Sequence, residues 1–215
     1  MRAIASWINN WDLKEAQSLD VYVEENGRKF LRHYLLDFGA TLGAAVNPTE
    51  YYHGHEYAFD LRSITKEIFS LGIHKSANEK RALILSPEIG SFTGAEFHPG
   101  KWKPTFASVM FSNMTDLDAF WATRVMLSFT REDLASIIET AEYTAPTTNN
   151  YMVETLLDRR RMVAAYWLGK VDALSKFEIE KTGAGVALNF RDLWVDQGLV
   201  LAESTKYRYQ VRGAR

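Results

Sequence analysis

Hydrophobic and polar residues alternate in residues 19–25 near the start of the chain, and a second short segment, residues 28–36, ends in a nearly continuous apolar run. Val and Tyr occur in the first segment and Phe and Tyr in the second, and these residue types favour extended strands. Asn26 and Gly27 separate the segments, and this dipeptide is a strong hairpin signal because both residues tolerate a positive φ. The pattern therefore predicts a β-hairpin with one buried face, preceded by a short apolar-faced helix over residues 2–9.

Helical periodicity dominates the middle of the chain. Apolar residues recur every three or four positions in four segments, residues 61–71, 115–129, 130–143 and 151–174. Thr130 followed by Asp133 is a capping box, in which each side chain satisfies a free backbone amide at the start of a helix. Residues 145–150 are rich in Thr and Asn and predict a break between helices. We expect Trp121 and Trp167 to lie in the core, because both fall on apolar helical stripes.

Short β-like runs separated by glycine and polar turns follow Phe177, including residues 198–202 and 206–213. They predict a small β-rich appendage over residues 176–215, attached to a larger unit formed by residues 1–175. The predicted fold class is therefore α+β and mostly helical, with an N-terminal β-hairpin and a small C-terminal β appendage.

Composition narrows the function classes. The 215 residues are 47% hydrophobic and 13% aromatic, which is enough to fill a core. The 25 basic and 27 acidic residues give a net charge of -2, so no basic excess indicates a nucleic-acid partner. Cysteine is absent, which excludes disulfides and thiolate metal sites. No apolar run is long enough for a membrane span and no signal peptide is evident, so we expect a cytoplasmic protein without a membrane partner, unless a segment precedes Met1.

Two acidic residues flank the predicted hairpin. Asp12 precedes Leu13 and Lys14 before the first strand, and Asp37 opens an Asp-Phe-Gly sequence directly after the second strand. Phosphoryl transfer from a nucleotide requires a carboxylate near the attacking hydroxyl, a lysine near the phosphate, and oxygen ligands for a divalent metal. The hairpin would bring Asp37 back toward Asp12. The alternative is an ordinary surface hairpin whose acidic side chains are solvated or cap turns.

The order of these residues resembles the catalytic half of a protein-kinase C-lobe. In kinases a loop with the pattern Asp, any residue, Lys, two residues and Asn is followed by a hairpin that ends in Asp-Phe-Gly. Here Gln17 stands in the position of the asparagine. The Asn10-x-Asp12 opening is also similar to HipA-like and other atypical bacterial kinases. The sequence "HYLLDFG" with a later "DRRR" helix resembles a group of uncharacterised bacterial proteins, and the resemblance covers residues 9–43.

The resemblance implies a kinase-like C-lobe that transfers a phosphoryl group from ATP. It makes Asp12 the general base or hydroxyl-orienting residue, and it places Lys14 beside the transferring phosphate. Asp37, assisted by Gln17, would hold the Mg²⁺ that accompanies ATP. The resemblance carries no information about the phosphate acceptor.

Two departures from the kinase pattern limit the expected activity. The amide of Gln17 lies one methylene further from the backbone than that of an asparagine, which changes the metal geometry. The chain also has no glycine-rich loop followed by a strand lysine, the part of a kinase that clamps the nucleotide. We therefore expect this chain to be nearly inactive alone, as a phosphotransferase remnant or pseudokinase. The missing N-lobe or a partner chain would dock near residues 1–40.

Other readings of the sequence stay open. A kinase-like scaffold without an N-lobe could be a non-enzymatic interaction module, which an apolar surface beside residues 1–40 would favour. A weaker alternative is a metal-dependent hydrolase that uses His53, His55 and Glu56, because His-x-His can bind metal. For the arginines in residues 158–162 we expect salt bridges with nearby acids such as Glu154.

Overall fold

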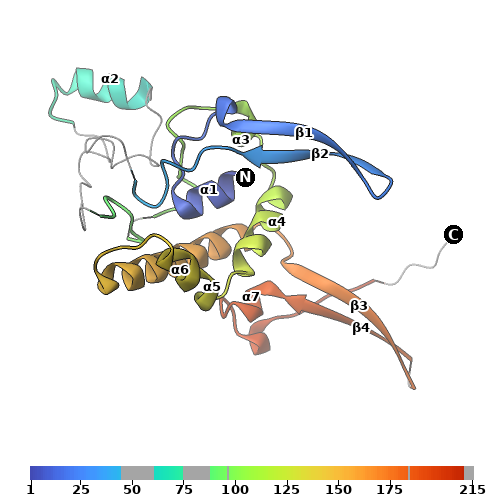
Figure 1. Cartoon of the computed structure of the whole chain (residues 1–215). Coiled ribbons are helices and arrows are strands. Elements are labelled where there is room, and N and C mark those ends of the chain that lie inside the picture. Colours follow the sequence, from blue (N-terminus) through green and yellow to red (C-terminus); the bar gives the residue numbers. More distant parts are fainter. Residues whose placement is uncertain (45–60, 75–87, 96, 184, 211–215) are drawn as a thin grey trace.

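The fold is taken from a computed structural model, which describes residues 1–44, 61–74, 88–95, 97–183 and 185–210. The body consists of α1 (Arg2–Ile8), α4 (Asp116–Leu127), α5 (Arg131–Glu139) and α6 (Pro146–Leu168). Helices α4 and α5 pack against α6, and α1 packs against both α4 and α6. Two antiparallel hairpins project from this body in the same general direction (Figure 1). The predicted α+β class with a helical body is confirmed.

The N-terminal hairpin follows a single 3-10 turn, η1 (Glu15–Gln17), and consists of β1 (Ser18–Glu25) and β2 (Arg28–Leu35). Its register pairs Glu25 with Arg28, which leaves Asn26 and Gly27 as a two-residue turn with φ of 52° and 73°. Positive φ at both positions is the requirement that Asn-Gly meets, so the predicted hairpin is confirmed.

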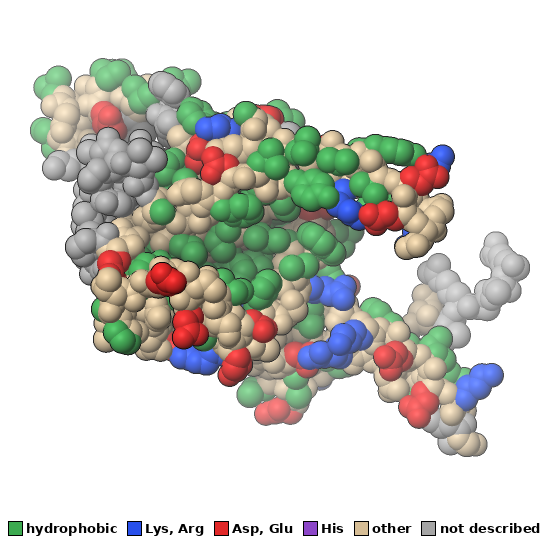
Figure 2. All heavy atoms as spheres, in the orientation of Figure 1, with side chains coloured by type: hydrophobic (Ala, Val, Ile, Leu, Met, Phe, Trp, Pro, Cys, Tyr) green, Lys and Arg blue, Asp and Glu red, His purple; other side chains and the backbone are tan. Residues whose placement is uncertain are grey.

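The expectation of one buried face for this hairpin is wrong. Tyr22 and Leu31 are register partners and are 60% and 56% exposed. Further large apolar side chains are exposed along the hairpin and just after it: Leu19, Phe30, Tyr34, Leu36 and Phe38. Figure 2 shows hydrophobic side chains gathered over this arm of the molecule. A two-stranded hairpin is only marginally stable by itself. Exposed apolar surfaces of this kind are typical of sites that pack against another element or protein.

Capping boxes fix the starts of two helices. Thr115 accepts a hydrogen bond from the backbone amide of Asp118 at the start of α4, and the Asp118 carboxylate accepts from the backbone amide of Thr115. Thr130 and Asp133 form the same reciprocal pair at the start of α5, as predicted. The hydroxyl and amide donors of Thr115 lower the pKa of Asp118. Both carboxylates also lie where the helix macrodipole favours negative charge.

The predicted break at residues 145–150 is wrong, because α6 begins at Pro146 and runs through this segment. Proline is well suited to the first turn of a helix, where its missing N–H has no intrahelical partner anyway. The helix also ends earlier than predicted, at Leu168. Trp167 is buried as expected, whereas Trp121 is 58% exposed and not part of the core.

The C-terminal hairpin consists of β3 (Leu174–Thr182) and β4 (Gly185–Asp192), followed by α7 (Leu193–Asp196). It is attached to the end of α6 by a small apolar cluster, formed by Ala164, Leu168, Ala173 and Leu193. Residues 198–202 and 206–213 do not form the predicted strands as far as they are described: the only regular element there is the single turn η3 (Ala202–Ser204).

Two short helices lie outside the body, α2 (Leu61–Phe69) and α3 (Val109–Ser112). Within the described part of the chain, no helix has the length and apolar character needed to cross a bilayer.

Arg159 of α6 ties α1 into the body. Its guanidinium donates hydrogen bonds to the carbonyl oxygens of Ser6 and Trp7, in the last turn of α1, and to that of Thr93 at 2.9 Å. Its side chain is buried, and its Cζ lies 3.7 Å from the centroid of the Phe97 ring. These bonds satisfy carbonyl groups that a helix end leaves without intrahelical partners.

The expected salt bridges of the arginine run are also wrong. Arg159 binds carbonyl groups, and Glu154 pairs with Arg131 of α5 instead. Burial lowers the pKa of the Arg159 guanidinium to about 9, so it still carries its charge at neutral pH. The cation is accommodated by carbonyl dipoles and aromatic ring faces, which are weaker partners than a carboxylate.

We predict that Arg159→Met lowers the free energy of unfolding by about 3 kcal/mol, because it leaves buried carbonyl groups without donors. Urea unfolding followed by circular dichroism measures the change. Arg161→Met is the matched control, since Arg161 is exposed on the same helix and its loss should change stability by less than about 0.5 kcal/mol. Equal effects of the two substitutions would show that Arg159 does not anchor α1.

Candidate functional site

The end of α1 directs the chain toward the candidate site. Asn9 caps the helix in the left-handed conformation, with φ 53° and ψ 44°, which turns the backbone away from the helix axis. Its Oδ1 accepts a hydrogen bond of 2.9 Å from Nε1 of the buried Trp102. Further along, the Trp11 carbonyl accepts from the Thr105 amide at 2.8 Å, and Leu13 is fully buried. The connector that carries Asp12 is therefore held on both sides.

The structure brings the four predicted site residues together. Gln17 Nε2 donates hydrogen bonds to Asp12 Oδ2 at 2.8 Å and to Asp37 Oδ2 at 3.0 Å. Lys14 Nζ lies 3.1 Å from both carboxylate oxygens of Asp12. Two carboxylates from opposite ends of the hairpin thus meet at one amide, and a lysine stands beside them. This group of four side chains is called the carboxylate cluster below.

Three backbone contacts fix Asp37 in the cluster. Asn10 Nδ2 donates to the Asp37 carbonyl at 3.1 Å, and the Gly39 amide donates to Asp37 Oδ1 at 2.8 Å. The Leu36 amide donates to the Gln17 carbonyl at 2.9 Å, so the residue after β2 pairs with the residue before β1. A Cβ at Gly39 would lie 3.2 Å from Asp37 Oδ1, a tight contact. Small size at this position therefore lets the backbone reach the carboxylate.

Two buried amide oxygens have no hydrogen-bond partner, Gln17 Oε1 in the cluster and Asn10 Oδ1 beside it. The two side chains are only 8% and 1% exposed. Buried polar atoms without partners are uncommon and costly in folded proteins. The cluster thus offers carboxylate and amide oxygens, the ligands that Mg²⁺ prefers, and an unused acceptor. The oxygen types of Asp37, Asp12 and Gln17 match those preferred by a hard divalent cation, while the nitrogen of Gln17 and not its oxygen faces the carboxylates.

The open side of the cluster is formed by residues that follow Lys14 and by a distant loop. Glu15 Oε1 accepts a hydrogen bond of 2.6 Å from the hydroxyl of Ser108, which lowers the pKa of Glu15. Lys14 Nζ lies 5.9 Å from the centroid of the half-exposed Phe106 ring. Lys14 is itself partly exposed, so its ammonium can reach a group that approaches from solvent.

Other candidate metal ligands add no site that can be described. Among the described residues, no group of three or more His, Asp or Glu side chains could hold a metal ion. The carboxylate cluster is not such a group, because its third oxygen donor is an amide. The predicted His53, His55 and Glu56 lie outside the described residues.

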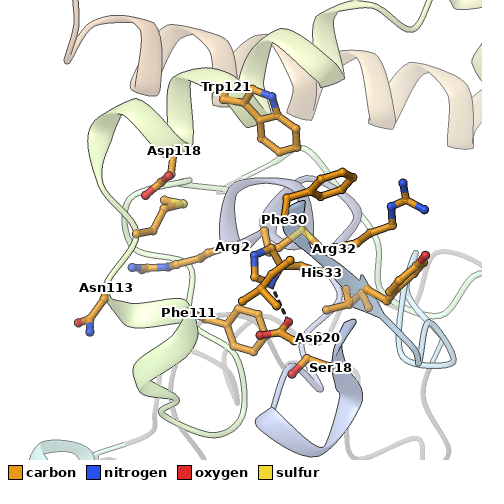
Figure 3. Close-up of a pocket in the computed structure, with 15 residues that line it drawn as sticks. Arg2, Ser18, Asp20, Phe30, Arg32, His33, Phe111, Asn113, Asp118 and Trp121 are labelled. Carbon is orange, nitrogen blue, oxygen red and sulfur yellow. Dashed lines mark hydrogen bonds and ion pairs between the residues drawn. The ribbon is translucent and has the colours of Figure 1, made fainter. Parts of the chain in front are cut away.

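A cavity of about 610 Å³ lies beside the N-terminal hairpin and does not include the carboxylate cluster (Figure 3). It is lined by β2 on one side and by the start of α1 and residues 111–121 on the other. Trp121 lies at one end and Ser18 and Asp20 at the other. Volumes of this size are typical of ligand pockets, but this one is continuous with the exposed apolar side chains Phe30 and Leu31.

Several polar side chains that line this cavity already have hydrogen-bond partners. His33 Nδ1 and Asp20 Oδ1 are 2.6 Å apart across the hairpin, and Arg2 donates to the Trp102 carbonyl at 2.9 Å. The sequence analysis did not identify this pair. The register predicted by the Asn-Gly turn would have found it, because counting outward from that turn places residues 20 and 33 opposite each other.

The comparisons with known proteins contribute no relative. No family model, no curated protein and no solved structure matches this chain. The chemistry of the site therefore rests on its geometry.

We predict that Asn10→Asp lowers the free energy of unfolding by about 2–3 kcal/mol at pH 7, because it replaces a buried donor with a third carboxylate. Thermal and urea unfolding measure the effect. Asn113→Asp is the control, since Asn113 is exposed and the same substitution there should be nearly neutral. If Asn10→Asp is equally neutral, Asn10 does not hold the Asp37 segment.

Proposed function

We propose that this chain supplies the catalytic half of a kinase-like, ATP-dependent phosphotransferase. The observation that carries the proposal is the convergence of Asp12 and Asp37 on the Gln17 amide, with Lys14 in contact with Asp12. A general base, a lysine and metal-binding oxygens are the groups that phosphoryl transfer needs from a protein. Two acidic side chains placed at the ends of a hairpin by chance would not be expected to accept hydrogen bonds from the same side-chain amide.

Each side chain has a role that follows from its position. Asp12 is partly exposed and would orient an acceptor hydroxyl and accept its proton. Lys14 would move from Asp12 toward the transferring phosphate, since its stem is flexible and its ammonium faces solvent. Asp37 and Gln17 would hold Mg²⁺, which when bound neutralises phosphate charge. The kinase-like C-lobe fold is part of this proposal.

The proposal requires a nucleotide-clamping part that these residues do not provide. We propose that it docks on the N-terminal hairpin, as a further lobe or a partner chain. The exposed apolar side chains of β1 and β2 and the adjoining cavity offer a surface for it. In its absence the chain would hold Mg²⁺ and phosphate groups weakly and transfer phosphate slowly or not at all.

The experiment is a titration of Mg²⁺ and ATP into the chain, followed by ³¹P NMR. Wild type should perturb the β- and γ-phosphate resonances of ATP in a Mg²⁺-dependent way, with a dissociation constant on the order of 1 mM. Asp37→Asn should weaken this binding about tenfold or more, since a tenfold loss corresponds to only 1.4 kcal/mol. No Mg²⁺-dependent perturbation by wild type would overturn the proposal.

A matched control keeps this test specific. Asp116→Asn makes the same chemical change at an exposed helix start away from the cluster, and it should leave ATP binding unchanged. Equal losses in Asp37→Asn and Asp116→Asn would show a general charge effect, and the metal role of Asp37 would be rejected.

A second candidate function is a non-enzymatic kinase-like interaction module. It is favoured by the large apolar side chains that the N-terminal hairpin leaves exposed on both faces. Patches of this kind on small proteins mark sites of association. Here the carboxylate cluster would serve to hold the hairpin in place, and no nucleotide would bind.

For the interaction module we predict self-association through the hairpin, measured by sedimentation velocity over a concentration series. Leu31→Glu should weaken it about tenfold or more, since it places a charge in the centre of the apolar surface. Ile179→Glu on the exposed C-terminal hairpin is the control and should have no effect. A wild-type chain that sediments as a monomer at every concentration would contradict dimerisation through this face.

A further inference from the structure

The side-chain amide of Gln17 lies between two carboxylates. Its Nε2 is 2.8 Å from Asp12 Oδ2 and 3.0 Å from Asp37 Oδ2, and both N–H bonds are used. An amide nitrogen with two polarised hydrogens is a neutral substitute for positive charge. With Lys14 on the other side of Asp12, it offsets the repulsion between the two acids.

The other end of the same amide is unsatisfied. Gln17 Oε1 is buried and accepts no hydrogen bond. A primary amide has nearly the same shape after a half-turn, so the oxygen and nitrogen can exchange places without moving the backbone. The observed orientation leaves the oxygen without a partner, because the carboxylates require a donor. The turned orientation would aim the oxygen at the carboxylates, which is favourable only with a cation between them.

We propose that the Gln17 side chain is a metal-gated amide switch. In the metal-free chain its nitrogen bridges Asp12 and Asp37, and on binding a divalent cation the amide turns to present Oε1 as a third ligand. This inference rests on the proposed function, since it concerns the same metal site. It goes beyond that function by assigning Gln17 an active role in closing the site when no metal is present.

The residues around the amide are held by contacts that do not depend on its orientation. Asp37 is held by its backbone through Asn10 and Gly39, so its position does not depend on Gln17. The Gln17 backbone is fixed by its bond with Leu36. A switch of this type lowers the apparent metal affinity by the fraction of time that the amide spends in the competent orientation. The longer glutamine side chain, in place of asparagine, is what spans both carboxylates.

The experiment follows Gln17 directly while Mg²⁺ alone is titrated into the intact chain. The side-chain amide resonances of ¹⁵N-labelled protein are assigned by their loss in Gln17→Glu, and saturable binding is recorded independently as a rise in Tm. We expect the Gln17 ¹H and ¹⁵N shifts to move with the same saturation curve as Tm. The amides of Gln197 and Gln210 serve as internal references and should not move.

A second variant tests the bridging nitrogen. Gln17→Glu keeps the shape but brings three carboxylates together without the bridging amide donor, so its Tm without metal should fall, and Mg²⁺ should restore it. Gln197→Glu adds the same charge away from the cluster and should show no such Mg²⁺-dependent recovery. An unchanged Tm for metal-free Gln17→Glu would overturn the bridging role.

The outcomes separate the switch from the function. Saturable Mg²⁺ binding with unmoved Gln17 resonances would overturn the switch and leave the proposed phosphotransferase site intact. No saturable Mg²⁺ binding, with ATP present or absent, would overturn both.

Discussion

A positive charge inside the protein, the Arg159 guanidinium, fixes the geometry on which the rest of the structure depends. It is held by backbone carbonyl groups at the end of α1 and by aromatic ring faces. Carbonyl groups at a helix end carry partial negative charge, so the helix dipole and the cation stabilise each other. Trp7 adds a reciprocal contact, because its indole nitrogen donates to the Leu156 carbonyl at 2.8 Å. Together these contacts set the point and direction at which the chain leaves α1.

The site follows from that exit direction through short local steps. Asn9 turns the backbone, Asn10 reaches across to the Asp37 carbonyl, and Asp12 faces the hairpin. The hairpin then returns Asp37 to the same place, with Gln17 as the shared contact. Two carboxylates a few ångströms apart near a protein surface repel by a few kcal/mol, and the cluster supplies an amide and an ammonium to offset this. Neutral bridging of this kind allows the two carboxylates to lie side by side.

The sequence predicted the elements with strong local chemistry. Asn26-Gly27 fixed the hairpin and its register, and the threonine and aspartate of the second capping box fixed the start of α5. The start of α6 at Pro146 could not be predicted in this way, because the polar residues after the proline are poor helix formers and their helix is stabilised by packing.

The sequence grouped four residues that the structure brings together, but it did not predict the hydrogen bonds among them. Motif order identified Asp12, Lys14, Gln17 and Asp37, but no local pattern shows which end of an amide faces a carboxylate. The role of Arg159 was not predicted for a related reason. Its burial depends on the backbone carbonyl groups of a helix that is distant in sequence, and the local sequence around it does not distinguish it from an exposed arginine. Trp121 is the opposite case. It lies on an apolar helical stripe, but the neighbouring hairpin leaves about half of its side chain exposed, and the stripe alone does not predict this.

The hydrogen bonds of Arg159 join residues that are far apart in sequence, and this separation affects the order in which the protein folds. Ser6 and Trp7 are separated from Arg159 by 153 and 152 residues. Residues 10–39, in contrast, make the contacts of the cluster among themselves, with separations of at most 27. Chains are made from the N-terminus, and contacts distant in sequence form slowly because loop closure is costly. The hairpin can therefore assemble early during synthesis, while its orientation on the body is set only when α6 has emerged. Its apolar strands are exposed during this interval, as they are in the finished fold, so the growing chain presents an apolar surface before the body has formed.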